Sequence, residues 1–155
     1  MRKTWSLLLC LLTLGLAGCT GKPPDNLGVR DGRLAPCPES PNCVSSQETD
    51  EVHGMEPLPF DLPQEQVQEL LLEVIQEMPR SQIITVEPGY VRAEFRSRIF
   101  RFVDDVEFYF DQEAGLLHYR SASRLGRSDL GVNRDRMVTI LGRLLEKMDQ
   151  AEAGE

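Results

Sequence analysis

Four motifs that mark common catalytic and nucleotide-binding sites are missing from this sequence: GxSxG, HExxH, the P-loop and GxGxxG. Cysteine pairs at the CxxC spacing of thiol redox sites are missing as well. Histidine is scarce, with only His53 and His118 in 155 residues, which leaves a zinc site short of ligands. We therefore expect no metal and no cofactor, and a non-enzymatic role is favoured over a catalytic one.

Basic residues are outnumbered by acidic ones. The chain carries 17 lysines and arginines against 25 aspartates and glutamates, a formal net charge of −8. Without Arg2 and Lys3, which belong to an N-terminal signal, 15 basic residues face 25 acidic ones, or −10. Anionic surfaces repel such a chain, so neither nucleic acid nor an anionic membrane face is expected as a general partner.

No apolar stretch is long enough to span a bilayer. The longest, WSLLLCLLTLGL, follows basic residues, and this combination predicts a signal peptide over residues 1–18. Small residues directly before Cys19, in LAGC, resemble a bacterial lipobox. We predict that Cys19 begins the mature chain and carries fatty acids such as palmitate, which anchor a protein to a membrane without spanning it. The alternative is an ordinary secretory signal with an incidental cysteine.

The chain beyond the signal divides into three parts. Residues 19–35 combine glycine, proline and charge, which is typical of a flexible tether. Residues 36–150 form the predicted single domain, and residues 151–155 a disordered tail. Thr20, rather than Asp, after the anchor favours the periplasmic face of the outer membrane if the cell is Gram-negative.

Two cysteines, Cys37 and Cys43, remain after Cys10 leaves with the signal and Cys19 is modified. An even pair in an oxidising compartment predicts a structural disulfide. The residues around it, up to the first helix, are dense in proline and turn formers, so we expect an irregular segment there.

Hydrophobic periodicity predicts an α+β domain: a four-stranded antiparallel sheet flanked by an N-terminal and a C-terminal helix packed on one face. Apolar residues at three-and-four spacing predict a first helix capped by Asp61 and ending at Met78, and a last helix over 133–150 capped by Asn133. Alternation and turn signals predict strands at 82–87, 90–97, 105–110 and 116–123. The other face of the sheet is expected to be open or covered by the segment around the disulfide.

Polar residues gather on that other face and in the loop after the sheet. On the strands, opposite charges predict cross-strand ion pairs on a solvated face. The loop between Ser121 and Arg136 brings arginines and hydrogen-bonding groups to a helix start, where N–H groups can bind an anion. The candidate ligand-binding residues are Arg96, Arg120, Ser121, Ser123, Arg124, Asp129, Asn133 and Arg134.

A structural interpretation of these candidates is favoured over a binding site. In it, Asp129 and Asn133 satisfy the backbone of the loop, and Arg124 and Arg134 pair with Asp104, Asp105 or Asp129.

Three segments, PCPESPNCVSSQ, RAEFRSRIFRFVDDVEFYF and YRSASRLGRSDLGVNRDR, together resemble the uncharacterised family called domain of unknown function 1499. The resemblance covers residues 34–145. It implies a single-domain protein, in bacteria often membrane-anchored or exported, and it implies no activity, substrate or catalytic residue.

Three functions follow as hypotheses. The leading one is an envelope lipoprotein with a non-catalytic domain that binds an envelope protein or a small anionic ligand. The second is an envelope hydrolase that uses Asp104, Asp105 or Glu107 with His118, although adjacent aspartates on a strand point to opposite faces. The third is a structural accessory of envelope assembly.

Overall fold

The computed structural model describes residues 21–154, so the predicted signal peptide, the predicted lipidation site Cys19 and the terminal Glu155 lie outside the described residues. Within this range the chain forms, in order, β1 (Cys43–Ser45), β2 (Leu58–Pro59), α1 (Gln64–Glu77), β3 (Ser81–Glu87), β4 (Tyr90–Arg96), β5 (Val103–Asp111), β6 (Leu116–Ser123) and α2 (Val132–Ala153). Neither helix of the described range has the length and apolar character needed to cross a membrane.

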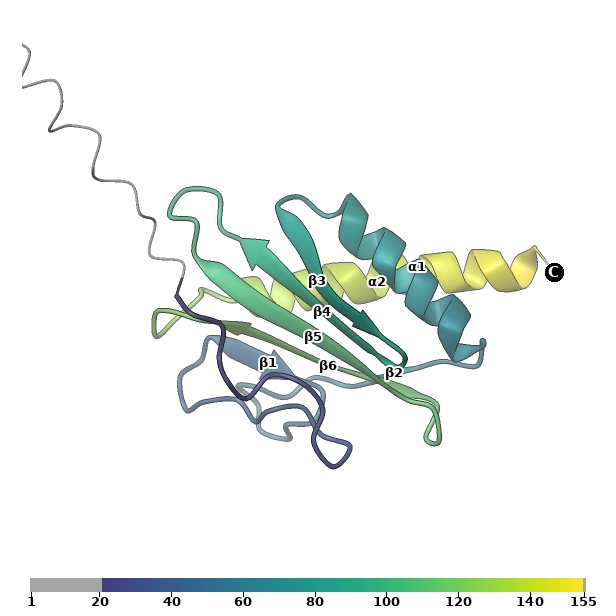
Figure 1. The fold of residues 1–155 in the computed structure, drawn as a ribbon, viewed down its shortest axis with the longest axis horizontal. Helices are drawn as coiled ribbons and strands as arrows, with labels where there is room; N and C mark the ends of the chain where they lie inside the picture. The colour runs from purple at the N-terminus through teal and green to yellow at the C-terminus, as the bar shows by residue number, and fades with distance from the viewer. Residues whose placement is uncertain (1–20, 155) are drawn as a thin grey trace, which may run out of the picture.

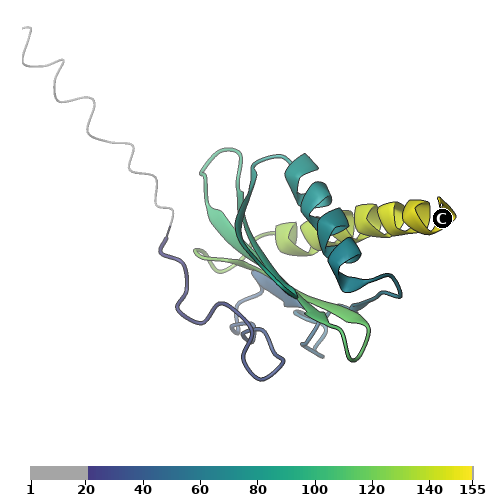
Figure 2. The same ribbon diagram turned by 45° about the vertical axis from the view of Figure 1, so that its right-hand side comes forward.

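The strands form one antiparallel sheet in the order β1-β6-β5-β4-β3, and β2 also pairs with β6. Both helices lie on one face of this sheet (Figure 1, Figure 2). The α+β class, the two helices and the antiparallel pairing are therefore confirmed. The predicted size of four strands is wrong, because two short strands from the proline-rich segment extend the sheet along the free edge of β6. The first helix is internal, since it follows these two strands.

Turn chemistry and alternation explain the central hairpins. Pro88 and Gly89 connect β3 to β4, and Gly89 has a φ of 76°, a left-handed conformation that side chains rarely adopt. Along β4, Val91, Ala93 and Phe95 are all buried in the hydrophobic core. Their polar neighbours therefore point to the opposite face, as strand geometry requires.

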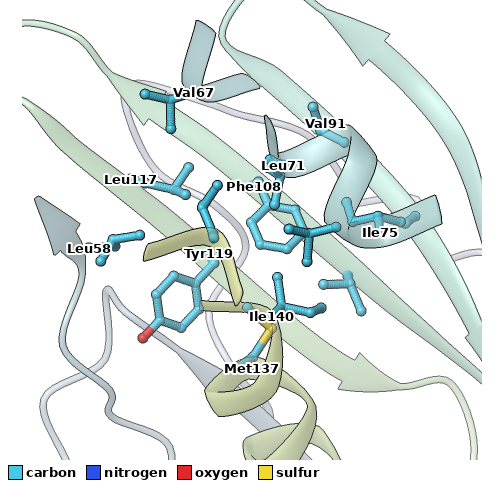
Figure 3. Close-up of a cluster of buried hydrophobic side chains, with 14 of the residues drawn as sticks. Leu58, Val67, Leu71, Ile75, Val91, Phe108, Leu117, Tyr119, Met137 and Ile140 are labelled. Atoms are coloured by element: carbon cyan, nitrogen blue, oxygen red, sulfur yellow. The ribbon is translucent and has the colours of Figure 1, made fainter. Parts of the chain in front are cut away.

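The core lies between the sheet and the two helices, as Figure 3 shows. Leu71 and Ile75 of α1 and Ile140 of α2 are completely inaccessible, and they meet Phe108 of β5 and Tyr119 of β6 in this cluster. Burying side chains of this size stabilises the fold by about 1.5–3 kcal/mol each. The apolar stripe of each helix thus fixes which face it turns to the sheet.

Both predicted helix caps are wrong. Helix α1 has Pro63 at its N-cap position and α2 has Gly131, and neither helix start has a side-chain cap hydrogen bond. Asn133 lies one residue inside α2, where its side chain turns inward to β6. The backbone N–H groups of Gly131 and Asn133 donate instead to the carboxylate of Asp129.

A strip formed by residues 24–38, here called the covering segment, crosses the sheet face opposite the helices (Figure 1, Figure 2). The Gly28 N–H donates to Glu107 of β5 at 2.7 Å, and the Leu34 N–H donates to Gln47 at 2.8 Å. The Cys37–Cys43 disulfide joins the end of this segment to β1. The cover over this face therefore begins well before the disulfide, and the predicted tether of residues 19–35 overlaps it.

Candidate functional site

A group of charged side chains is buried beneath the covering segment. We call it the arginine–carboxylate cluster; its members are Tyr90, Arg92, Glu94, Arg96, Asp105, Glu107, Arg120 and Arg124. Strands β4, β5 and β6 place alternate residues on this face, and Arg124 follows β6 directly. The carboxylates of Asp105 and Glu107 are 1% and 0% exposed, so the expected solvated face is in fact closed.

Asp105 is held by two arginines. It accepts from Arg92 Nη2 at 2.8 Å and from Arg124 Nε at 2.7 Å. Glu94 forms salt bridges with the same two guanidinium groups. Burial alone raises the pKa of the Asp105 carboxyl, but the hydrogen bonds from Arg124 and Arg92 outweigh it and hold that pKa below its usual range. Asp105 is therefore an ion-pair centre and remains charged at neutral pH.

Glu107 has one satisfied oxygen and one without a partner. Its Oε1 accepts from the Gly28 N–H at 2.7 Å and from the Tyr90 hydroxyl at 2.9 Å. Its Oε2 has no hydrogen-bond partner within residues 21–154 and lies 3.6 Å from Arg120 Nη1. Burial, followed by the nearby Glu107 charge, raises the pKa of Tyr90. The tyrosine thus stays a proton donor to Glu107 at neutral pH.

Arg120 is the least satisfied member of the cluster. Its side chain is 7% exposed, and its Nε has no hydrogen-bond partner in the described part of the chain. The 3.6 Å separation from Glu107 is longer than a hydrogen bond. Burial is the largest influence on the pKa of the Arg120 guanidinium and lowers it, although Glu107 and Asp105 act in the opposite direction.

A pocket of about 360 Å³ opens beside Arg120. The sheet side of its wall includes Asp105, Arg120 and Arg124, and the covering segment closes the other side with Asn26 and Pro36. A larger groove of about 950 Å³ passes Tyr90 and Arg92, but Arg92 is already paired with Asp105 and Glu94. The smaller pocket is therefore the one that contains an unsatisfied charge.

A second polar network lies on the helix side of the sheet. Arg136 of α2 donates to Asp104 at 2.5 Å, to Asn133 at 2.6 Å and to Ser121 at 3.0 Å. Its guanidinium also lies 4.9 Å from the centre of the Phe95 ring. Each of these polar groups has a partner, so this helix-side network fastens α2 to the end of the sheet.

The eight predicted ligand-binding residues are thus divided between two faces. Arg96, Arg120 and Arg124 belong to the arginine–carboxylate cluster. The helix-side network and the start of α2 contain Ser121, Ser123, Asp129 and Asn133. Arg134 lies apart, where it donates to the carbonyl oxygens of Val52 and Gly54.

Sequence reasoning missed two parts of these sites. The covering segment lies about 80 residues before the strand that it contacts, since Gly28 reaches Glu107 at a sequence separation of 79. Arg136 was not singled out, although the pattern Asn-x-x-Arg at a helix start places both side chains on one face. That spacing is the signal that could have identified it.

The residues of the hydrolase hypothesis are not gathered at one point. Asp104 pairs with Arg136 on the helix side, whereas Asp105 and Glu107 lie beneath the covering segment. His118 stacks on Tyr109 with 6.1 Å between ring centres, and its Nδ1 lies 3.2 Å from the Ser46 hydroxyl. Burial lowers the pKa of this histidine.

Within residues 21–154 no three histidine, cysteine or carboxylate side chains are grouped as a metal site requires.

The fold and the site define an α+β protein that carries a buried arginine–carboxylate cluster with a small adjoining pocket. Residues 33–144 match the protein family described as "Protein of unknown function (DUF1499)", and the chain belongs to this family. A comparison with curated proteins found no match.

Proposed function

We propose that this protein is a cell-envelope lipoprotein, anchored through Cys19, whose domain binds a small oxyanion such as a carboxylate or phosphate group at Arg120. The observation that carries the binding proposal is the buried guanidinium of Arg120, which borders a pocket and has an Nε without a hydrogen-bond partner in the described chain. Buried polar groups are normally hydrogen-bonded, and an exception calls for an explanation.

Charge in the arginine–carboxylate cluster favours an anion. Its four guanidinium groups, on Arg92, Arg96, Arg120 and Arg124, face the three carboxylates of Glu94, Asp105 and Glu107, which leaves a formal charge of 4 − 3 = +1. The carboxylates of Glu94 and Asp105 are shared by the other arginines. Arg120 has no carboxylate within hydrogen-bond distance in the described chain, since its one salt-bridge partner, Glu107, lies 3.6 Å away. An oxyanion in the pocket would supply an acceptor to this guanidinium at roughly 1.5–3 kcal/mol for each charged hydrogen bond.

The binding proposal is tested with Arg120→Met. We expect inorganic phosphate or acetate to raise the Tm of the wild-type protein in a concentration-dependent way, because a ligand that binds only the folded state stabilises it. The variant should lose this shift. Thermal unfolding is followed by circular dichroism, with chloride at the same ionic strength as the reference.

Arg143→Met is the matched control, because Arg143 is exposed on α2 and lies away from the pocket. It should keep the full shift. Equal shifts in the wild type and Arg120→Met would show that phosphate and acetate act elsewhere, and the binding proposal would fail.

The anchor is supported by the signal and lipobox sequence and is tested separately. In bacteria expressing the full chain, metabolic labelling with an alkyne fatty acid should label the wild type and leave Cys19→Ala unlabelled, because the acyl chains attach at that cysteine. Mass spectrometry should then find a wild-type N-terminal peptide that begins at residue 19 with added fatty acids. A labelled alanine variant, or an unlabelled wild type, would contradict the anchor.

A further inference from the structure

Two loops at the same end of the sheet expose large apolar side chains. The β4–β5 loop, residues 97–102, and the β6–α2 loop, residues 124–131, leave neighbouring strand ends, since Asp104 pairs with Ser123 in the sheet. The exposed fraction reaches 93% for Leu130, 78% for Ile99 and 70% for Phe100. Single exposed apolar residues are ordinary on a soluble surface, but a group of them at one end indicates a contact with another apolar phase.

The same loops carry positive charge. Arg98, Arg101 and Arg127 are all exposed, and none of them forms a salt bridge with any residue of the described range. The β4–β5 loop, SRIFRF, contains no acidic residue. This end of the molecule therefore reverses the negative charge of the chain as a whole, and the expectation that an anionic membrane is disfavoured does not apply to it.

The chain also enters the fold at this end. The carbonyl oxygen of Gly21 accepts from Arg124 Nη1 at 3.4 Å, and a Cβ at Gly21 would lie 3.4 Å from the side chain of Leu125. Figure 1 shows the start of the described chain beside the β6–α2 loop. Cys19 precedes Gly21 by two residues, which span at most about 7 Å when fully extended. A lipid on Cys19 would therefore hold these loops within reach of the headgroups.

We propose that these two loops form a membrane-docking surface that inserts Ile99, Phe100 and Leu130 among the headgroups of an anionic phospholipid layer. The three exposed arginines, Arg98, Arg101 and Arg127, would then contact the anionic headgroups. This proposal rests on the lipid anchor proposed above and is independent of ligand binding at Arg120. Aromatic and aliphatic side chains with adjacent arginines are the usual composition of interfacial contacts. The acyl chains keep the surface at high effective concentration, so a weak contact suffices to orient the domain.

Tryptophan placed in the loop reports docking directly. The only native tryptophan, Trp5, lies in the predicted signal peptide, so the acylated protein that begins at Cys19 contains no tryptophan except the one introduced. The acylated protein with Phe100→Trp is purified from membranes and reconstituted into vesicles of phosphatidylethanolamine and phosphatidylglycerol. We expect its emission to shift to the blue and to be quenched when the lipids carry bromine on their acyl chains. Val86→Trp, half exposed at the far end of β3, is the control and should be neither shifted nor quenched.

The charge of the lipid gives a second measurement. In the Phe100→Trp protein, Arg98→Gln and Arg101→Gln should each lower the ratio of docked to free loop on phosphatidylglycerol vesicles by about five-fold. On vesicles of phosphatidylcholine alone these two changes should have little effect. Loss of quenching on anionic vesicles alone is the signature of attraction between these arginines and the net negative charge of the headgroups.

Three other outcomes would overturn the proposal. Absence of bromine quenching in a protein whose fatty acids are confirmed by mass spectrometry would reject the docking surface and leave the anchor intact. A blue shift without quenching, together with crosslinks between loops of two copies or to another protein, would assign the surface to a protein partner. Absence of the fatty acids would reject the anchor itself.

Discussion

Replacing Asp105 by alanine is expected to lower the free energy of unfolding by about 3–5 kcal/mol, because it leaves two buried guanidinium groups with Glu94 as their only remaining salt-bridge partner in the described chain. The Arg92 and Arg124 side chains are 12% and 5% exposed, so solvation by water compensates little for the lost carboxylate. Urea denaturation at neutral pH measures the loss. Asp61→Ala is the control, since Asp61 is exposed and does not cap α1; it should change stability by less than about 0.5 kcal/mol.

The pH dependence of this difference is a sharper test. The pKa of Asp105 is lower in the folded protein than in an unfolded chain, where an aspartate titrates near pH 3.9. A lowered pKa means that the carboxylate stabilises the fold above that pH and that the stabilisation is lost as pH falls through the folded value. The stability gap between wild type and Asp105→Ala should therefore shrink below about pH 4. A small or pH-independent gap would show that the cluster does not depend on this charge.

Replacing Arg136 by methionine is expected to have a similarly large effect, about 3–5 kcal/mol, for a different reason. The change keeps most of the side-chain volume but leaves Asp104 buried without a counter-ion, and it removes the contact with the Phe95 ring. Ser121 and Asn133 lose a donor as well. The free energy of unfolding from urea denaturation is again the measurement.

The double variant Asp104→Leu with Arg136→Met separates charge from packing. Replacing a buried ion pair by apolar residues of similar size is often neutral or stabilising, so the double variant should recover most of the lost stability. If it is as unstable as Arg136→Met alone, the helix-side network stabilises the fold through its hydrogen bonds to Ser121 and Asn133 rather than through the ion pair.

Periodicity in the sequence was enough to predict the helices and the four long strands. On each helix the apolar residues form a single stripe that must face the sheet, as Leu71, Ile75 and Ile140 do. On β4 apolar residues alternate with charged ones, and the apolar set is Val91, Ala93 and Phe95. The two short strands have no such pattern in their sequence. Strands β1 and β2 have three and two residues, too few for a period, and they exist because β6 offers them a free edge.

Only part of the candidate site could be predicted from the sequence. Alternating signs along β4 and β5 correctly predicted that the charges form cross-strand pairs, as Arg92 and Asp105 do. The sequence left open whether this face is exposed or covered by the segment around the disulfide, because most of the cover comes from residues 24–35, which by composition are typical of a flexible tether. The inward orientation of the Asn133 side chain was not predicted either, because it depends on Gly131 occupying the N-cap position of α2, two residues before the predicted cap.

The path of the covering segment couples release of the domain from the membrane to opening of the pocket. The chain that leads to the predicted anchor is the same chain that closes the pocket beside Arg120 and donates to Glu107 through Gly28. A single proteolytic cut between Asn26 and Leu34 would free the domain from the membrane and unfasten the lid of its pocket at once. Such a cut would thus release the proposed oxyanion together with the domain, and an occupied pocket would slow the cut.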